Sequence, residues 1–410
     1  MTRTTLVAVL IAVIAVAAAQ GGDCPCFRGP AGDGQFPETG LLKQWPDGGP
    51  KVTWMAKGLG VGYSSATVAN GTVYVTGMDD QKQGCLFAFG ADGSPKWKTA
   101  YGPELDKRGP AAAGTRGTPT IDGDRAFLVT GFGKLVTFDA AKGQVLKIVD
   151  LPERFGAKQA QFGFAESVLV DGQKLICTPG GPDASLAALD KNTGEVLWKT
   201  KGLSQPTGCC SARIINYNSR RLVLNMLAQS VVAVDAGTGE VVWQHDYPHR
   251  AGVQPNPPLY ADGLVYVTSG MGVGGAMLSL ADNSPAAAPK WTDKTLDCQM
   301  QGTVLIDGCI YGTAQSGNKG LVCLDWKSGK AMWNAPAVGM GVVIAADGML
   351  YVYGPDGKMY LAKPNSAVFE PVSQFTISEG TDEHWAHPTI ANGRLFVRHG
   401  DALIVYEIKS

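Results

Sequence analysis

The sequence predicts an all-β fold in which eight antiparallel blades, each of four strands, form a closed β-propeller. Three observations lead to this prediction. One phrase containing Asp, Gly and Trp occurs three times with the same spacing. A hairpin-type turn followed by an alternating apolar run recurs about every 46 residues. Finally, a strand-like segment near the start of the chain matches a strand that the last unit lacks.

The repeated phrase reads Ala-x-Asp-x-x-Thr-Gly-x-x-x-Trp, with Cys for Ala and Ser for Thr in the third copy. We expect the Asp to accept hydrogen bonds from loop amides and the Gly to adopt the left-handed conformation. The Trp falls on the fourth strand, where its apolar ring packs against a neighbouring blade. The residues concerned are Asp190, Gly194, Trp198, Asp235, Gly239, Trp243, Asp325, Gly329 and Trp333.

Each copy of the phrase belongs to a larger unit that contains an Asn-Gly or Asp-Gly turn. These dipeptides supply the positive φ angles that tight hairpins need. In the second unit the pattern predicts strands over 118–121, 126–130, 134–138 and 144–149. No unit shows helical periodicity, which excludes helical repeats. The turns that mark the eight units are Asn70-Gly71, Asp122-Gly123, Asp171-Gly172, the degenerate Asn218-Ser219, Asp262-Gly263, Asp307-Gly308, Asp347-Gly348 and Asn392-Gly393.

The ring is expected to close by pairing its two ends. The last unit, His387 to Ile408, supplies only three strands. Gly48 to Trp54 resembles a fourth strand that carries its Trp, and no first three strands precede it. Pairing the two segments completes blade eight and removes exposed strand edges.

The chain is expected to divide into a signal peptide (1–19), an N-terminal segment (20–47) and the propeller (48–410). Residues 6–16 form an apolar run too short to span a bilayer, and small residues before Gln20 suit a signal peptidase. We therefore expect a periplasmic or secreted monomer without a membrane span. The balance of 35 basic and 36 acidic residues argues against nucleic-acid binding.

Nine cysteines are many for an exported chain, and we expect some of them to form disulfides. The odd count leaves at least one thiol free or joined to another chain. The adjacent pair Cys209-Cys210 is the most unusual spacing, and it leads directly into the opening strand of blade four. From the spacing alone, strand residues near the central channel are the ordinary explanation for these two cysteines.

The repeated phrase resembles the blade motif of quinoprotein alcohol dehydrogenase-like propellers. At this size the chain looks like a secreted PQQ-like repeat protein, distantly similar to the outer-membrane assembly factor BamB. The segment from Cys26 to Pro46 and the run from His384 to Pro388 resemble the secreted bacterial group as well. BamB-like members carry the motif without a cofactor. The resemblance therefore implies the fold but does not decide whether the protein binds PQQ.

The resemblance also implies candidate residues for a quinone site at the mouth of the channel. Cys209 and Cys210 correspond to a disulfide over the quinone, while Glu166 and Asn256 are candidates for a quinone-linked calcium ion. Arg116 would bind an anion there or, alternatively, satisfy neighbouring loop carbonyls. No haem-attachment Cys-x-x-Cys-His is present, and no catalytic residue can be named.

His384 and His387 are the candidates for a metal site, because His-x-x-His can place two imidazoles on one ion. The alternative is that both residues only hold the loop into blade eight.

The function predicted first is a binding or scaffold role through the inter-blade loops, which should gather on one face. Expected partners are an envelope or extracellular protein, a peptide or a carbohydrate. The alternatives are a PQQ-dependent dehydrogenase of alcohols or sugars and a BamB-like scaffold for outer-membrane protein assembly. Fold alone does not decide among them.

Overall fold

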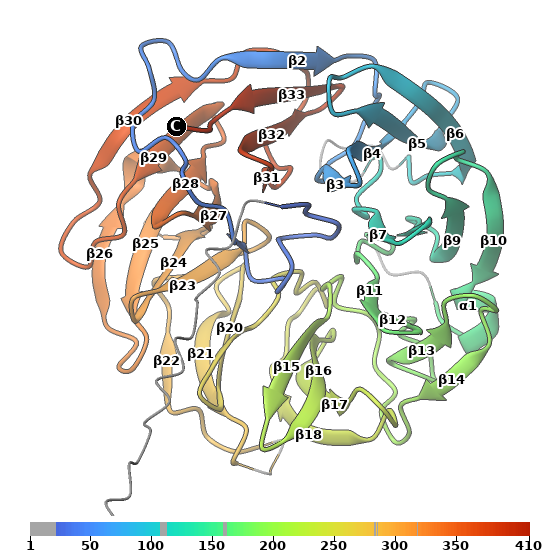
Figure 1. Cartoon of the computed structure of the whole chain (residues 1–410). Coiled ribbons are helices and arrows are strands. Elements are labelled where there is room, and N and C mark those ends of the chain that lie inside the picture. Colours follow the sequence, from blue (N-terminus) through green and yellow to red (C-terminus); the bar gives the residue numbers. More distant parts are fainter. Residues whose placement is uncertain (1–21, 107–112, 159–161, 283, 285, 318) are drawn as a thin grey trace, which may run out of the picture.

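The computed structural model shows eight antiparallel blades of four strands each, arranged in a ring around a central channel, with one further strand added to the seventh blade (Figure 1). It describes residues 22–106, 113–158, 162–282, 284, 286–317 and 319–410. The predicted eight-bladed all-β propeller is therefore confirmed. The predicted signal peptide, residues 1–19, lies outside the described residues. Within the described residues, no helix has the length and apolar character needed to cross a membrane.

Blades one to four follow one another along the chain, each with its first strand next to the channel (Figure 1). Blade one contains β3 (Thr67–Ala69), β4 (Thr72–Met78), β5 (Gln83–Gly90) and β6 (Pro95–Pro103). Blade two contains β7 (Thr120–Asp122), β8 (Arg125–Val129), β9 (Lys134–Asp139) and β10 (Val145–Asp150). Blade three contains β11 (Leu169–Asp171), β12 (Lys174–Cys177), β13 (Ala187–Asp190) and β14 (Val196–Lys199). Blade four contains β15 (Arg213–Tyr217), β16 (Arg220–Met226), β17 (Ser230–Asp235) and β18 (Val241–Asp246).

Blades five to seven repeat the same order. Blade five contains β19 (Leu259–Ala261), β20 (Leu264–Ser269), β21 (Gly274–Ser279) and β22 (Trp291–Asp293). Blade six contains β23 (Thr303–Ile306), β24 (Cys309–Ala314), β25 (Gly320–Asp325) and β26 (Ala331–Ala335). Blade seven contains β27 (Val342–Ala346), β28 (Met349–Tyr353), β29 (Lys358–Ala362) and β30 (Pro371–Thr376). Two short helical turns lie between blades, namely α1 (Leu151–Phe155) and the 3-10 turn η1 (Pro336–Val338).

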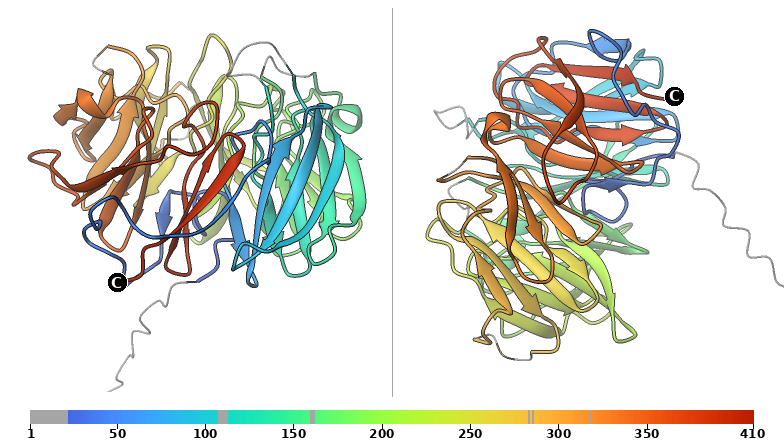
Figure 2. Two further views of the ribbon diagram at one scale, coloured as in Figure 1. Left: turned by 90° about the horizontal axis from the view of Figure 1, so that it is seen from above. Right: turned by 90° about the vertical axis from the view of Figure 1, so that its left-hand side faces the viewer.

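Blade eight closes the ring from both ends of the chain, as predicted. It contains β31 (Thr389–Ala391), β32 (Arg394–His399) and β33 (Ala402–Glu407), and its outer strand is β2 (Val52–Ala56). Within this pairing Trp54 stands opposite Val405. In both views of Figure 2 the C-terminus lies on the side where the N-terminal segment enters the ring.

The repeated phrase forms the turn between the third and fourth strands, as its residue types suggested. Asp190 Oδ1 accepts hydrogen bonds from the backbone amides of Asn192 and Thr193, each at 2.8 Å. These amides hold the pKa of Asp190 below its ordinary value. Gly194 has a φ of +74° and donates its N–H to the Asp190 carbonyl at 2.8 Å.

In four blade pairs the Trp of one blade rests on the Gly of the next blade's turn. A Cβ atom placed on Gly239 of blade four would lie 2.6 Å from the ring of Trp198 in blade three. The Trp198 indole N–H also donates to the carbonyl of Ala236, 3.1 Å away, in the same turn. The same contact joins Trp54 to Gly93, Trp97 to Gly143 and Trp291 to Gly329.

The first residue of the phrase is small because it faces the Trp within its own blade. Ala188 is paired with Trp198, Ala233 with Trp243, and Cys323 with Trp333. In each of these three pairs the register shifts at the next residue of the third strand, which is a β-bulge.

No disulfide forms, so the prediction that some cysteines pair is wrong. All nine cysteines are free, and eight of them are buried. Four of them, Cys85, Cys177, Cys309 and Cys323, lie on separate strands, where they pack as small apolar residues. The adjacent Cys209 and Cys210 turn their sulfurs to different carbonyls, those of Gly163 at 3.5 Å and Asn256 at 3.6 Å.

We predict that Gly239→Ala destabilises the protein more than Gly308→Ala does. Both glycines have positive φ angles, +77° and +74°, but a Cβ on Gly308 meets nothing within 4 Å. Gly308→Ala should therefore cost about 1 kcal/mol of unfolding free energy from backbone strain alone. Gly239→Ala should cost about 2 kcal/mol more because it displaces Trp198. Urea unfolding of both variants measures the difference, and equal shifts would contradict the Trp–Gly contact between blades.

Candidate functional site

All eight inter-blade loops contribute to one cavity at the mouth of the channel. This loop-face cavity has a volume of about 320 Å³. Most of its walls are apolar, and no Asp or Glu is among the described residues that line it. The side chains that represent the loops into blades one to eight, in order, are Tyr63, Arg116, Phe162, Cys209, Pro255, Gln299, Met340 and Trp385.

The floor of this cavity comes from the start of the chain. Residues 25–34, here named the plug, enter the ring from the opposite face and lie inside it (Figure 1, dark blue). β1 (Gln35–Phe36) follows and adds a parallel strand to β27 on the inner edge of blade seven. Phe27 lines the loop-face cavity and also the cavity on the other side of the plug.

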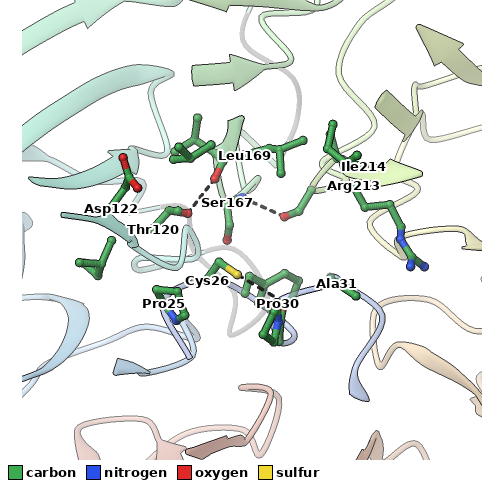
Figure 3. Close-up of a pocket in the computed structure, with 18 of the residues that line it drawn as sticks. Pro25, Cys26, Pro30, Ala31, Thr120, Asp122, Ser167, Leu169, Arg213 and Ile214 are labelled. Atoms are coloured by element: carbon green, nitrogen blue, oxygen red, sulfur yellow. Dashed lines mark hydrogen bonds between the residues drawn. The ribbon is translucent and has the colours of Figure 1, made fainter. Parts of the chain in front are cut away.

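The second cavity, named the plug-face cavity, lies between the plug and blades two to four (Figure 3). Its volume is about 480 Å³. Its charged groups have protein partners: Lys191 Nζ lies 2.5 Å from Asp122 Oδ2, and Arg213 NH2 lies 3.4 Å from Asp33 Oδ2. The thiol of Cys26 donates to the Gly29 carbonyl at 3.3 Å. These contacts give the ion pairs and the Cys26 thiol structural roles, although Nε of Arg213 has no hydrogen-bond partner.

Arg28 anchors the plug in the channel. Its guanidinium donates to the carbonyl of Thr303 at 2.7 Å, to the carbonyl of Val343 at 3.4 Å and to Nδ1 of His387 at 2.9 Å. The side chain is buried, and this burial lowers the pKa of Arg28 to about 10. Because that value is still well above neutrality, a buried positive charge joins the plug to blades six, seven and eight.

His387 is fixed in one neutral tautomer by its two partners. Since arginine can only donate, Nδ1 accepts from Arg28, and Nε2–H donates to the Met300 carbonyl at 2.8 Å. Burial, together with the charge of Arg28, lowers the pKa of His387 to about 3. Neither nitrogen is left to bind a metal.

His384 is occupied elsewhere. Its Nδ1 lies 2.5 Å from the Tyr353 hydroxyl, and its ring stacks on that of His399 with 3.7 Å between centroids. Burial and His399 lower the pKa of His384 to about 4. Among the described residues, no group of three His, Cys, Asp or Glu side chains could hold a metal ion. The structure therefore does not bring His384 and His387 together around a metal.

Glu166 lies behind the wall of the loop-face cavity, which its neighbour Ala165 lines. Only 1% of Glu166 is exposed, and both of its carboxyl oxygens accept from the backbone N–H of Thr178, at 2.8 and 3.1 Å. Burial raises the pKa of this carboxyl to about 7. The structure thus turns Glu166 towards blade three.

Asn256 and the two adjacent cysteines also make contacts within the protein. Asn256 donates to the Cys298 carbonyl at 2.6 Å and accepts from the Gly302 amide at 3.0 Å. Cys209 lines the cavity with a φ of +66°, whereas Cys210 is fully buried and is not part of the lining. Burial raises the pKa of Cys209 to about 11, so its thiol is protonated at neutral pH.

Arg116 lines the cavity and donates a hydrogen bond from NH1 to the carbonyl of Phe162. This contact is the loop-carbonyl alternative raised from the sequence. Burial lowers the pKa of Arg116, while Cys209 and Glu104 oppose that shift.

The residues at this mouth do not fit a calcium-linked quinone. Glu166 faces Thr178, the oxygen of Asn256 is already used by a backbone amide, and no carboxylate lines the cavity. A calcium ion requires several oxygen ligands that converge. The described residues offer no such cage.

Sequence reasoning missed Phe27 and Arg28, which form and anchor the floor of the cavity. They lie before the first repeat, so the periodicity gives no information about them. The only available signal was an Arg beside Phe in a Gly-rich segment with few other charges, Cys26-Phe27-Arg28-Gly29-Pro30. That pattern does not reveal that the segment lies inside the ring.

We predict that Glu166→Gln flattens the pH dependence of stability. The folded state keeps the carboxyl neutral up to its pKa of about 7, whereas the unfolded chain loses the proton near 4.5. Between these values, rising pH should remove up to about 3 kcal/mol of unfolding free energy from the wild type. Urea unfolding from pH 5 to 8 measures this loss, with the exposed Glu195→Gln as control. An unchanged slope in Glu166→Gln would refute the assignment.

Comparisons with known proteins agree with this architecture. The family model described as "Outer membrane protein assembly factor BamB" matches residues 49–158 and 82–335. No curated protein is significantly similar in sequence.

Several solved structures share the fold at low sequence identity. BamB from Moraxella catarrhalis is 16% identical with a TM-score of 0.60, and the match covers 84% of this chain and 94% of that one. The quinohemoprotein alcohol dehydrogenase from Comamonas testosteroni is 13% identical with a TM-score of 0.67, covering 95% and 81%. A europium-containing methanol dehydrogenase is 12% identical with a TM-score of 0.65, covering 93% and 91%. Identities this low show the fold alone.

The two family-model matches together run from residue 49 to residue 335, which is more than half of the 410 residues. The chain therefore belongs to the PQQ-like β-propeller family whose model is named for the outer membrane protein assembly factor BamB.

Proposed function

We propose that this protein is an exported binding protein that holds a partner on its inter-blade-loop face, and that it carries out no quinone chemistry. One observation carries the proposal: all eight inter-blade loops meet at a single cavity whose floor is the plug. Loops on one face of a rigid ring are suited to recognition because the scaffold holds them in place. An acidic metal cage and an activated nucleophile are both missing from the described lining of this cavity.

The aromatic pair Tyr63 and Trp385 forms part of the surface that we expect the partner to contact. Their ring centroids lie 5.5 Å apart, although the residues belong to loops at opposite ends of the chain. Both side chains line the cavity. Tyrosine and tryptophan are among the residues that most often contribute a large share of the binding free energy at interfaces. An envelope or extracellular protein is the partner that fits both this surface and the family of the chain.

We predict that the double variant Tyr63→Ala/Trp385→Ala loses the partner. Purified wild type, this variant and the opposite-face control Lys142→Ala would be cross-linked in an envelope extract, and captured proteins identified by mass spectrometry. At least one protein should be captured by the wild type and the control and lost by the double variant, because the two rings supply contact area. If the double variant captures the same proteins, the loop face is not the binding surface.

A scaffold role in outer-membrane protein assembly is the second candidate, and the family match over residues 49–335 favours it. The same capture experiment separates the two readings. Components of the assembly machinery would support the scaffold role, whereas unrelated envelope proteins would support a different binding role.

The quinone alternative gives a separate prediction. Protein mixed with equimolar PQQ and calcium should retain no quinone spectrum after gel filtration and should not reduce dye with alcohols or sugars. The physical reason is that Glu166 and Asn256 are engaged within the protein and cannot encircle a calcium ion. Stoichiometric, calcium-dependent PQQ retention would make the protein a quinoprotein and overturn the proposal.

A further inference from the structure

We propose that the loop-face cavity binds one aromatic residue of an extended polypeptide, through both its ring and its backbone amide. This inference rests on the proposed function, because it names what the binding face accepts. It is carried by three features of the cavity: its apolar walls, its charge and two glutamine amide atoms without partners.

The walls suit an aromatic ring. Met271, Met300 and Met340 come from three different loops, and Phe27 and Phe162 complete the apolar surface. Methionine side chains adapt to the shape of a ligand, and their sulfurs make favourable contacts with aromatic rings. The volume of about 320 Å³ lies at the small end of ligand sites, which span roughly 300–1,000 Å³. The space is therefore suited to a single residue.

The charge of the lining excludes one class of ligand. Arg116 is positive, His387 is neutral, and the described lining contains no carboxylate. A protonated amine would meet a like charge there without a counter-ion. A lysine or arginine side chain is therefore disfavoured, whereas a neutral ring is accepted.

Two glutamine side chains in the wall each have one amide atom without a hydrogen-bond partner. Gln301 Oε1 accepts from the Met300 amide at 3.0 Å, which fixes its orientation and leaves Nε2 as an unused donor. Gln299 Oε1 is an unused acceptor. Gln299 is 9% exposed and Gln301 is 2% exposed, so each unpaired atom costs about 1–3 kcal/mol.

One donor and one acceptor on the same loop match the two polar groups of a peptide unit. The backbone N–H of a bound residue can pair with Gln299 Oε1, and its carbonyl with Gln301 Nε2. Gln301 keeps its bond from the Met300 amide and offers Nε2 in that orientation, whereas the soft last torsion of Gln299 allows its Oε1 to turn towards the bound residue. A sugar ring fits less well, since most of its hydroxyl groups would lie against Met and Phe side chains.

The test uses the purified protein with its methionine methyl groups labelled with carbon-13. The chain has 11 methionines, and NMR reports on each methyl group separately. The probes are N-acetyl-phenylalaninamide, N-acetylglycinamide, ethylbenzene and methyl glucoside. Met271→Leu, Met300→Leu and Met340→Leu assign the three signals from the cavity.

N-acetyl-phenylalaninamide should shift the three cavity methyl signals in a saturable way, and it should bind about tenfold more tightly than ethylbenzene. N-acetylglycinamide should cause no shift. In Gln299→Leu/Gln301→Leu the affinity for N-acetyl-phenylalaninamide should fall about tenfold, to the level of ethylbenzene, while ethylbenzene binds as before. The control Gln173→Leu, on the other side of the plug, should match the wild type.

The proposal is overturned if methyl glucoside shifts these signals in place of the blocked phenylalanine. It is also overturned if ethylbenzene and N-acetyl-phenylalaninamide bind the wild type equally. If the double glutamine variant does not fold, the comparison of the four probes on the wild type still tests the proposal. Failure of this test would not refute the proposed binding function. The capture experiment with Tyr63→Ala/Trp385→Ala tests that function separately, because it does not depend on which ligand the cavity takes.

Discussion

The contact between the Trp of one blade and the Gly of the next is the interaction on which this ring depends. Trp198 occupies the space that a side chain on Gly239 would need, and Trp54, Trp97 and Trp291 make the same contact with their neighbours. Trp198 and Trp97 also face a small residue in their own blades, Ala188 and Ala88, which leaves room for the ring. A single aromatic residue thus holds its sheet together and sets the position of the next one.

This ring encloses a channel that the chain fills from one side. Arg28 joins the plug to three blades, and the resulting floor divides the channel into two cavities with different surroundings. On the plug side, charged groups are paired with one another. On the loop side, the walls are apolar and two amide atoms have no partner. The division explains why the loop face is the better candidate for recognition, although the plug-face cavity is larger.

The repeats allowed the fold to be predicted from sequence, but the same reasoning could not locate the site. Turn chemistry and the Trp phrase are local, so blade number and the pairing of Trp54 with the last blade followed from spacing alone. Strand ends in the second blade differ by one or two residues. Site residues depend on side-chain direction, which no repeat encodes. Glu166 belongs to the right loop yet points to Thr178, and Phe27 lies far from the loops in sequence yet forms their floor.

The position of the plug couples the first part of the chain to the last. Arg28 reaches its partners only when Thr303, Val343 and His387 are already in place, up to 359 residues further along. The same end of the chain contributes the outer strand of the last blade. A partly translated or truncated chain therefore lacks both a closed ring and a floor beneath its loops. The proposed recognition at the loop face therefore requires the complete chain, because only then are its loops and their floor both in place.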